Sequence, residues 1–139
     1  TFAYIGDTTV SFNNVKGLAC PEMLGNLIAD YKPNNWRFTY RLRFAGKQYM
    51  ELLNLDEFAI EAFTVSSLSA SHTFGNFLHT GDLTFMATVE NLFDKEYEAS
   101  GYGWNFGTFD GSSISFTGGA EYYVAAERSW YGQIKLSLF

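Results

Sequence analysis

The three arginines of the stretch 36–44, WRFTYRLRF, are the residues of this sequence whose spacing most clearly suggests chemistry. Arg37, Arg41 and Arg43 alternate with aromatic rings or leucine. Successive side chains of a β-strand point to opposite faces, so this stretch would have one apolar face and one cationic face. The cationic face could attract an anionic ligand or pair with acidic groups, and we favour the pairing.

A second candidate lies in the glycine-rich stretch 101–107, GYGWNFG. Its rings, Tyr102 and Trp104, could stack on a ligand, although packing against neighbouring loops is the favoured interpretation. The Gly-x-Gly pattern is not a dinucleotide-binding motif, because no βα unit surrounds it.

Other reactive residue types form no recognisable catalytic or metal-binding arrangement. His72 and His79 have no carboxylate or cysteine at ligand spacing. Asp110, Ser112 and Ser113 lie together, but no histidine or nucleophile-elbow motif accompanies them. We therefore predict a protein that is not an enzyme and has neither a metal site nor a cofactor.

Composition favours a chain that buries large ring surfaces. Aromatic residues make up 19% of the 139 residues, whereas charged residues make up only 17%, below the usual quarter. Lipid is one environment that could cover such surfaces. A net charge of −6 argues against a nucleic-acid partner. The single cysteine, Cys20, excludes an internal disulfide. The first residue is Thr1, so we expect a preceding segment.

Periods of two predict the elements that position these residues. Clear strands are expected at 36–44, 83–91 and 130–138, and further strands at 24–31 and 63–74, with a weak one within 1–12. The total is about six strands, without a helix. A change of phase in the fifth stretch predicts a β-bulge near Ser66 and Ser67.

Long and short connections are expected to alternate along the chain. Short turns are predicted at 32–35 and 75–82, and long loops at 13–23, 45–60 and 92–120. Acidic Glu51, Asp56 and Glu57 in the second of these loops are expected to be solvated. This alternation is typical of outer-membrane barrels, whose strands of about 9–11 residues cross the bilayer.

In such a barrel the apolar face of each strand meets lipid and the polar face meets the lumen. On this basis Arg37, Arg41 and Arg43 face the lumen. The predicted lipid-facing residues are Trp36, Phe38, Tyr40, Leu42, Phe44, Leu83, Phe85, Val89, Ile134, Leu136 and Leu138.

Two segments near the end of the chain resemble TonB-dependent outer-membrane receptors. The stretch 89–97, VENLFDKEY, is similar to the NLFDxxY segment of that family, and 121–139 resembles its final strand. A Tyr, an Arg and a terminal Phe recur there, matched here by Tyr122 or Tyr123, by Arg128 and by Phe139. A weaker similarity, at 46–49 (GKQY), extends the resemblance to about residues 33–139.

The resemblance implies an outer-membrane transporter of a Gram-negative bacterium that imports an iron–siderophore complex, cobalamin or a similar scarce solute. It implies a plugged barrel of about 22 strands, energised by the TonB complex, with Phe139 as a signal for the barrel assembly machinery. About six antiparallel strands cannot close such a barrel, and lipid tolerates no unpaired strand edge. Residues 1–139 are therefore predicted to be the C-terminal part of the transmembrane barrel domain, without the plug, paired with strands of the same or another chain.

Two other classes of protein remain as alternatives. A soluble β-barrel that binds a small ligand would line a closed pocket with the ring-bearing faces, but it explains neither the long loops nor the terminal Phe139. An outer-membrane enzyme barrel would need a Ser/His or paired-carboxylate set on adjacent strands, and the sequence offers none.

Overall fold

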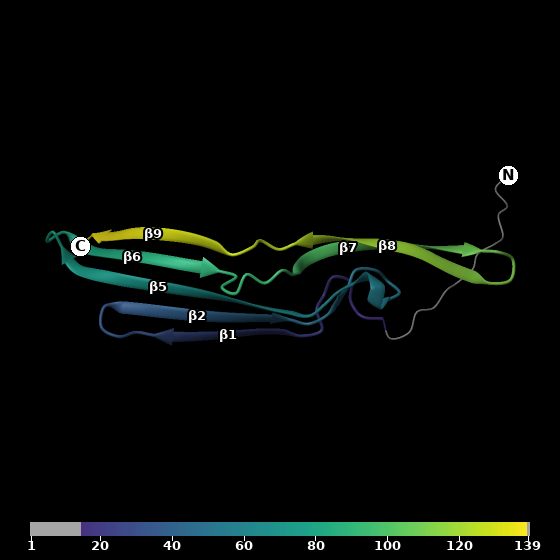
Figure 1. Ribbon diagram of the computed structural model, residues 1–139, viewed down its shortest axis with the longest axis horizontal. Coiled ribbons are helices and arrows are strands. Elements are labelled where there is room, and N and C mark those ends of the chain that lie inside the picture. The colour runs from purple at the N-terminus through teal and green to yellow at the C-terminus, as the bar shows by residue number, and fades with distance from the viewer. Residues whose placement is uncertain (1–14, 139) are drawn as a thin grey trace.

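A computed structural model describes residues 15–138 and contains a five-stranded antiparallel sheet and a separate two-stranded ribbon. In spatial order the sheet consists of β1 (Leu24–Tyr31), β2 (Trp36–Ala45), β5 (Phe63–Phe77), β6 (Gly81–Glu90) and β9 (Ser129–Leu138). Figure 1 shows these strands side by side, with β1 at the bottom and β9 at the top. All five correspond to predicted strands. The weak strand expected within 1–12 lies outside the described residues.

The connections at the two ends of the sheet differ greatly in length. At one end, here called the short-turn end, residues 32–35 join β1 to β2 and residues 78–80 join β5 to β6. The first turn is closed by a hydrogen bond of 3.0 Å from the Trp36 amide to the Pro33 carbonyl oxygen, and Asn34 takes a φ of 51°. At the other end, called the long-connection end, residues 46–62 and 91–128 join neighbouring strands. The predicted alternation is therefore confirmed.

The connection 46–62, called the β2–β5 connection, folds into a small compact unit. It contains β3 (Gln48–Tyr49), the single-turn helix η1 (Asp56–Phe58) and β4 (Ala59–Ile60), and β3 pairs with β4. Met50 and Ile60 are nearly fully buried here. Buried apolar residues of the described chain thus gather at the long-connection end, since a single-layered sheet has no interior of its own.

The connection 91–128 contains the ribbon, which corrects the prediction of a loop at 92–120. Its strands are β7 (Glu98–Phe109) and β8 (Ile114–Val124), paired along their lengths and extending away from the sheet (Figure 1). Glycines and polar residues concealed this hairpin in the sequence because they interrupt the expected apolar alternation. Within residues 15–138 no helix is long and apolar enough to cross a membrane.

The pairing of β2 with β5 corrects the predicted β-bulge. Its register runs without a break from Ala45 opposite Phe63 to Trp36 opposite His72, so Ser66 and Ser67 carry no bulge. The irregularity of β5 lies instead between Phe74 and Phe77, against β6. The change of phase has another cause, because Phe63 turns to the polar side and packs its ring 4.4 Å from that of Tyr97.

Candidate functional site

The register of the five sheet strands places all predicted lipid-facing residues on one face, called the apolar face. Directly paired residues of antiparallel strands share a face, and rows such as His72, Phe85 and Ile134 cross the sheet in this way. The sequence analysis missed further members of this face, namely Leu27, Tyr31, Leu68, Phe74 and Trp130. Most of these side chains are uncovered, and Ile134 is 69% exposed. So large an exposed apolar surface marks a contact with lipid or protein.

Aromatic rings crowd the short-turn end of the apolar face. The Trp36 ring stacks on Phe38 at 5.7 Å and meets His72 edge-on at 4.6 Å, and Phe74 lies 4.4 Å from His72. The Nδ1 atom of His72 is buried without a hydrogen-bond partner. A band of rings at one end of an apolar face is the arrangement of aromatic girdles at a membrane interface.

The opposite, polar face of the sheet separates the three predicted arginines. Near the short-turn end, the Arg37 guanidinium donates to the Asp30 carboxylate at 2.7 Å, which ties β2 to β1. The Thr39 hydroxyl donates to the same carboxylate. Arg37 is therefore neutralised within the sheet and is less available to a ligand than the other two.

Arg41 and Arg43 lie together near the long-connection end and form the cationic part of the candidate site. Both line a cavity of about 330 Å³, to which Ser67, Asn91 and Glu127 also contribute. Within residues 15–138 neither guanidinium forms an ion pair, and that of Arg43 lies 5.6 Å from the centre of the Phe63 ring. The cavity therefore presents two arginines without ion pairs together with two carboxylates, those of Glu90 and Glu127.

Between these two regions the polar face carries hydroxyl groups that bond to one another. Ser69 pairs with Thr88 at 2.9 Å, and Thr73 pairs with Thr84 at the same distance, both across β5 and β6. Nearer the cavity, the Tyr131 hydroxyl donates to Glu90 at 3.3 Å. This part of the wall is polar, and four of its hydroxyl groups bond in pairs across the two strands.

Tyr102 and Trp104 belong to the ribbon and not to the cavity. Their ring centres are 5.9 Å apart, and both side chains are nearly half exposed. The Tyr102 hydroxyl donates to Glu121 at 2.8 Å, and this bond raises the pKa of Tyr102 above its ordinary value. The structure therefore separates the two predicted ligand-binding groups, arginines and rings, onto different elements.

Glu51 corrects the expectation that the acidic residues of the β2–β5 connection are solvated, because it is only 2% exposed. Its carboxylate accepts hydrogen bonds from the amides of Leu53 and Leu55, at 2.5 and 2.6 Å, and from the side chain of Asn105 in β7, at 2.5 Å. No residue pattern signals this role, since Asn105 lies in another connection.

The two sequence segments that resemble the receptor family meet at the base of the ribbon. Buried Asn91 accepts a hydrogen bond from the Lys95 amide at 2.9 Å, and its own amide group donates to the carbonyl oxygens of Lys95 and Ala126. Asp94 accepts a bond of 2.8 Å from the Arg128 amide. The motif residues therefore fix the two ends of the ribbon together. Phe139 lies outside the described residues.

Residues 15–138 contain no group of three or more His, Cys, Asp or Glu side chains that could hold a metal ion. Cys20 is exposed and is not in a disulfide.

A single-layered sheet with one apolar and one polar face, and with long connections at one end only, defines a segment of a transmembrane antiparallel β-barrel. Its fold is similar to that of the ferric citrate transporter FecA in the unliganded form, with a TM-score of 0.61 and 25% sequence identity. The match covers 84% of this chain and 16% of that chain. It confirms the resemblance to a TonB-dependent receptor barrel. No family model matches, and no curated protein matches either.

Proposed function

We propose that the chain forms part of the barrel wall of a TonB-dependent transporter in the outer membrane of a Gram-negative bacterium. The observation that carries this proposal is the register of the sheet, which keeps the apolar residues of five strands on one face. That face meets lipid, and the polar face lines the lumen. β6 and β9 have ten residues each, the length that a tilted strand needs to cross the bilayer.

The solute that fits this wall is an anionic iron chelate. Arg41 and Arg43 offer unpaired charges at the long-connection end, which corresponds to the cell surface in outer-membrane barrels. The structural neighbour is a ferric citrate transporter, which supports iron chelates over cobalamin. Arg37 serves the wall itself through Asp30.

The remaining partners follow from the incomplete barrel. The chain spans about a sixth of its structural neighbour, so other strands, of the same or another polypeptide, pair with β1 and β9 and enclose the plug. The plug region contacts the TonB complex, and the barrel assembly machinery inserts the chain with Phe139 as its signal.

The lipid assignment is tested by two adjacent residues at mid-strand in β9. Ile134 lies on the apolar face and Gln133 on the polar face, and both side chains are exposed. Ile134→Arg should cost about 2–4 kcal/mol of folding free energy in lipid or block insertion, because an arginine would face the bilayer core. Gln133→Arg, the matched control, should fold normally. Folding is followed by heat-modifiable gel mobility and urea titration of the complete receptor in lipid vesicles.

Equal tolerance of both variants would contradict the membrane assignment. It would favour the alternative, a soluble β-barrel that binds a small ligand, in which the apolar face is covered by protein.

A further inference from the structure

The two faces of the ribbon differ in what covers them. One face, called the glycine face, carries Gly101, Gly103 and Asn105 and lies against the β2–β5 connection. A Cβ atom at Gly103 would stand 2.7 Å from the Met50 carbonyl oxygen, and one at Gly101 would stand 3.4 Å from the Met50 sulfur. The absence of side chains thus permits this contact, which the bond from Asn105 to Glu51 secures.

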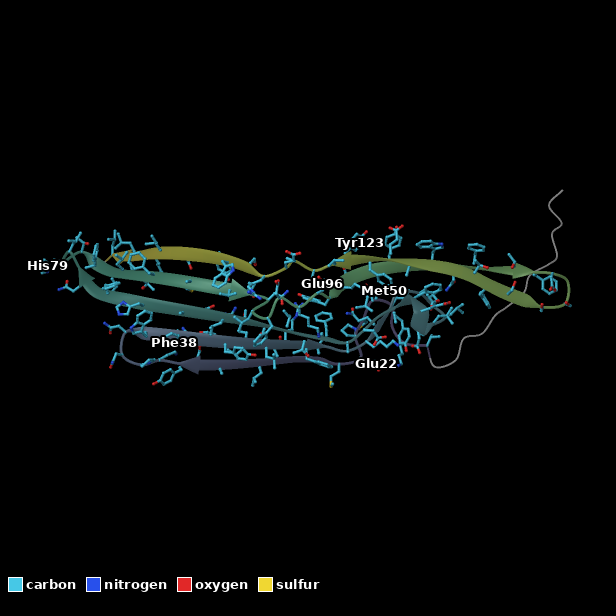
Figure 2. The ribbon with its side chains drawn as sticks, in the orientation of Figure 1. Glu22, Phe38, Met50, His79, Glu96 and Tyr123 are labelled. Carbon is cyan, nitrogen blue, oxygen red and sulfur yellow. The ribbon has the colours of Figure 1, made fainter. Side chains whose placement is uncertain are left out.

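The other face of the ribbon, called the aromatic face, carries Tyr102, Trp104, Phe106 and Tyr123. These side chains are 45–57% exposed. The Tyr102 ring centre lies 5.9 Å from that of Trp104 and 6.4 Å from that of Tyr123, and the Trp104 ring lies over Gly119. Figure 2 shows Tyr123 on the side of the ribbon opposite Met50.

The aromatic face points toward the incomplete side of the barrel. Tyr123 projects upward in Figure 2, and Figure 1, in the same orientation, shows the edge strand β9 at the top of the sheet. In a closed barrel another strand must pair with the free edge of β9, since lipid leaves no backbone group unpaired. β9 begins at Ser129, at the long-connection end, so an antiparallel neighbour runs toward that end. The connection that follows this neighbouring strand would therefore begin at the long-connection end, beside the aromatic face.

We infer that the aromatic face is the docking surface for the connection that follows the barrel strand paired with β9. The glycine face offers a precedent, because it packs against the β2–β5 connection, which is the neighbouring connection on that side of the ribbon. Contact on both sides would hold the ribbon between two connections and complete the ring of connections around the outer mouth. This inference rests on the proposed barrel but not on the identity of the solute.

Accessibility to a membrane-impermeant maleimide, measured on cells that express the complete receptor with Cys20→Ser, tests whether the face is covered. Phe106→Cys on the aromatic face is compared with Phe109→Cys on the opposite face near the ribbon tip. In the described chain these side chains are 54% and 46% exposed. We expect the thiol at position 106 to react at least about tenfold more slowly than that at 109, and both to react equally in urea. Equal rates in the folded receptor would overturn the inference.

Photo-crosslinking of the same receptor identifies what covers the face. A benzophenone amino acid replaces Phe106 in one variant and Trp130, on β9, in another. The peptide captured from position 106 should follow directly, in sequence, the strand captured from position 130. Capture of lipopolysaccharide or of a distant connection by position 106 would overturn the inference. So would protection that appears only when ferric citrate is added. If position 130, which lies on the apolar face, captures neither a barrel strand nor lipid, the barrel proposal itself fails.

Discussion

At the residue scale, Glu51 shows why one part of the candidate site could not be predicted from the sequence. Its acidic neighbours Asp56 and Glu57 are exposed, as expected, whereas Glu51 is buried. The difference arises from Asn105, which is distant in sequence and reaches the carboxylate only after the ribbon folds against the β2–β5 connection. The arginines were easier to find, because alternation alone fixes their face. Their different roles depend on whether an acid lies on the neighbouring strand, as Asp30 does for Arg37.

Glu51→Gln should loosen the ribbon from the β2–β5 connection. Both carboxylate oxygens accept from amide N–H groups, so the amide nitrogen of glutamine would face a donor. An unsatisfied buried group costs about 1–3 kcal/mol. We expect hydrogen exchange in peptides of β7, measured by mass spectrometry on the receptor in detergent, to accelerate roughly tenfold.

Glu57→Gln is the matched control, because the Glu57 side chain is exposed and only its backbone oxygen accepts a bond, from Tyr122. Unchanged exchange in the Glu51 variant would show that the carboxylate does not hold the ribbon.

The cluster of Lys47, Asp56 and Glu61 should make the β2–β5 connection sensitive to acid. The Lys47 ammonium donates to Asp56 at 2.8 Å and lies 3.2 Å from Glu61. The hydrogen bond with Asp56 raises the pKa of Lys47 to about 12, and its counterpart lowers the pKa of Asp56 below the ordinary 3.8. The contribution of Asp56 is thus present above pH 3.8 and is lost as the pH falls through its lowered pKa. The contribution of Lys47 is present below pH 10.5 and is lost as the pH rises through 12.

A spin label at exposed Leu52 reports this change. Its mobility should be low near neutral pH and increase below about pH 3.8. Asp56→Asn should give the mobile spectrum at every pH. An immobile label in the Asp56 variant would mean that this ion pair does not hold the connection.

At the element scale, periodicity predicted the five sheet strands because one face of each is largely apolar. Periodicity failed for the ribbon, because one face of the ribbon must lie close to the backbone of the β2–β5 connection and need not be apolar. Glycine at 101 and 103 satisfies that requirement and resembles a loop signal in a single sequence. The mistaken β-bulge has a related cause. Phe63 lies on the polar face, where its ring packs against Tyr97. An apolar residue on that face looks in the sequence like a change of phase, because the sequence does not show which face the residue occupies.

The turn between β5 and β6 should be open to stabilisation. Leu78 and His79 have φ angles of 50° and 61°, and Leu78 is 74% exposed. A left-handed conformation costs a residue with a Cβ atom about 1–2 kcal/mol, whereas glycine avoids that cost. Leu78→Gly should therefore stabilise the receptor by about 1 kcal/mol after the greater chain entropy of glycine is subtracted, as measured by urea titration in lipid vesicles.

The control is Asn34→Gly in the other short turn, where φ is 51° but asparagine already tolerates the conformation. Its expected effect is near zero. Destabilisation by Leu78→Gly would show that the leucine side chain has a contact that outweighs the backbone cost.

At the scale of the whole molecule, the arginines of the polar face differ in their ion pairing along the length of β2. Arg37 is paired near the short-turn end, whereas Arg41 and Arg43 are without ion pairs among residues 15–138. Glu90 and Glu127 line the same cavity as these two arginines, so the cavity presents both signs of charge. An arginine without an ion pair at the mouth of a lumen can still attract an anion and raise its rate of entry. The sequence predicted the arginines but could not predict which of them is paired, because that depends on the register between β1 and β2.

Simultaneous Arg41→Gln and Arg43→Gln substitutions should raise the half-saturating concentration for uptake of radioiron-labelled ferric citrate by roughly tenfold. Lys135→Gln, on the polar face nearer the short-turn end, is the control and should leave uptake unchanged. Uptake of an uncharged ferric hydroxamate, if the receptor accepts one, should be unaffected by either change. Normal ferric citrate uptake by the double variant would show that the two arginines do not attract the solute and instead pair with groups of the plug or of the wall.

The hydroxyl pairs along β5 and β6 have a mechanical consequence for such a transporter. In each of the pairs Ser69–Thr88 and Thr73–Thr84, one of the two hydroxyl hydrogens lies in the bond between the two groups. A plug seated against this strip would therefore find fewer free donors than four separate hydroxyl groups would offer. The attachments between such a plug and the wall would then be concentrated at the charged residues near the two ends of the strip. In the proposed transporter, a plug displaced along this strip would therefore break few hydrogen bonds with the wall.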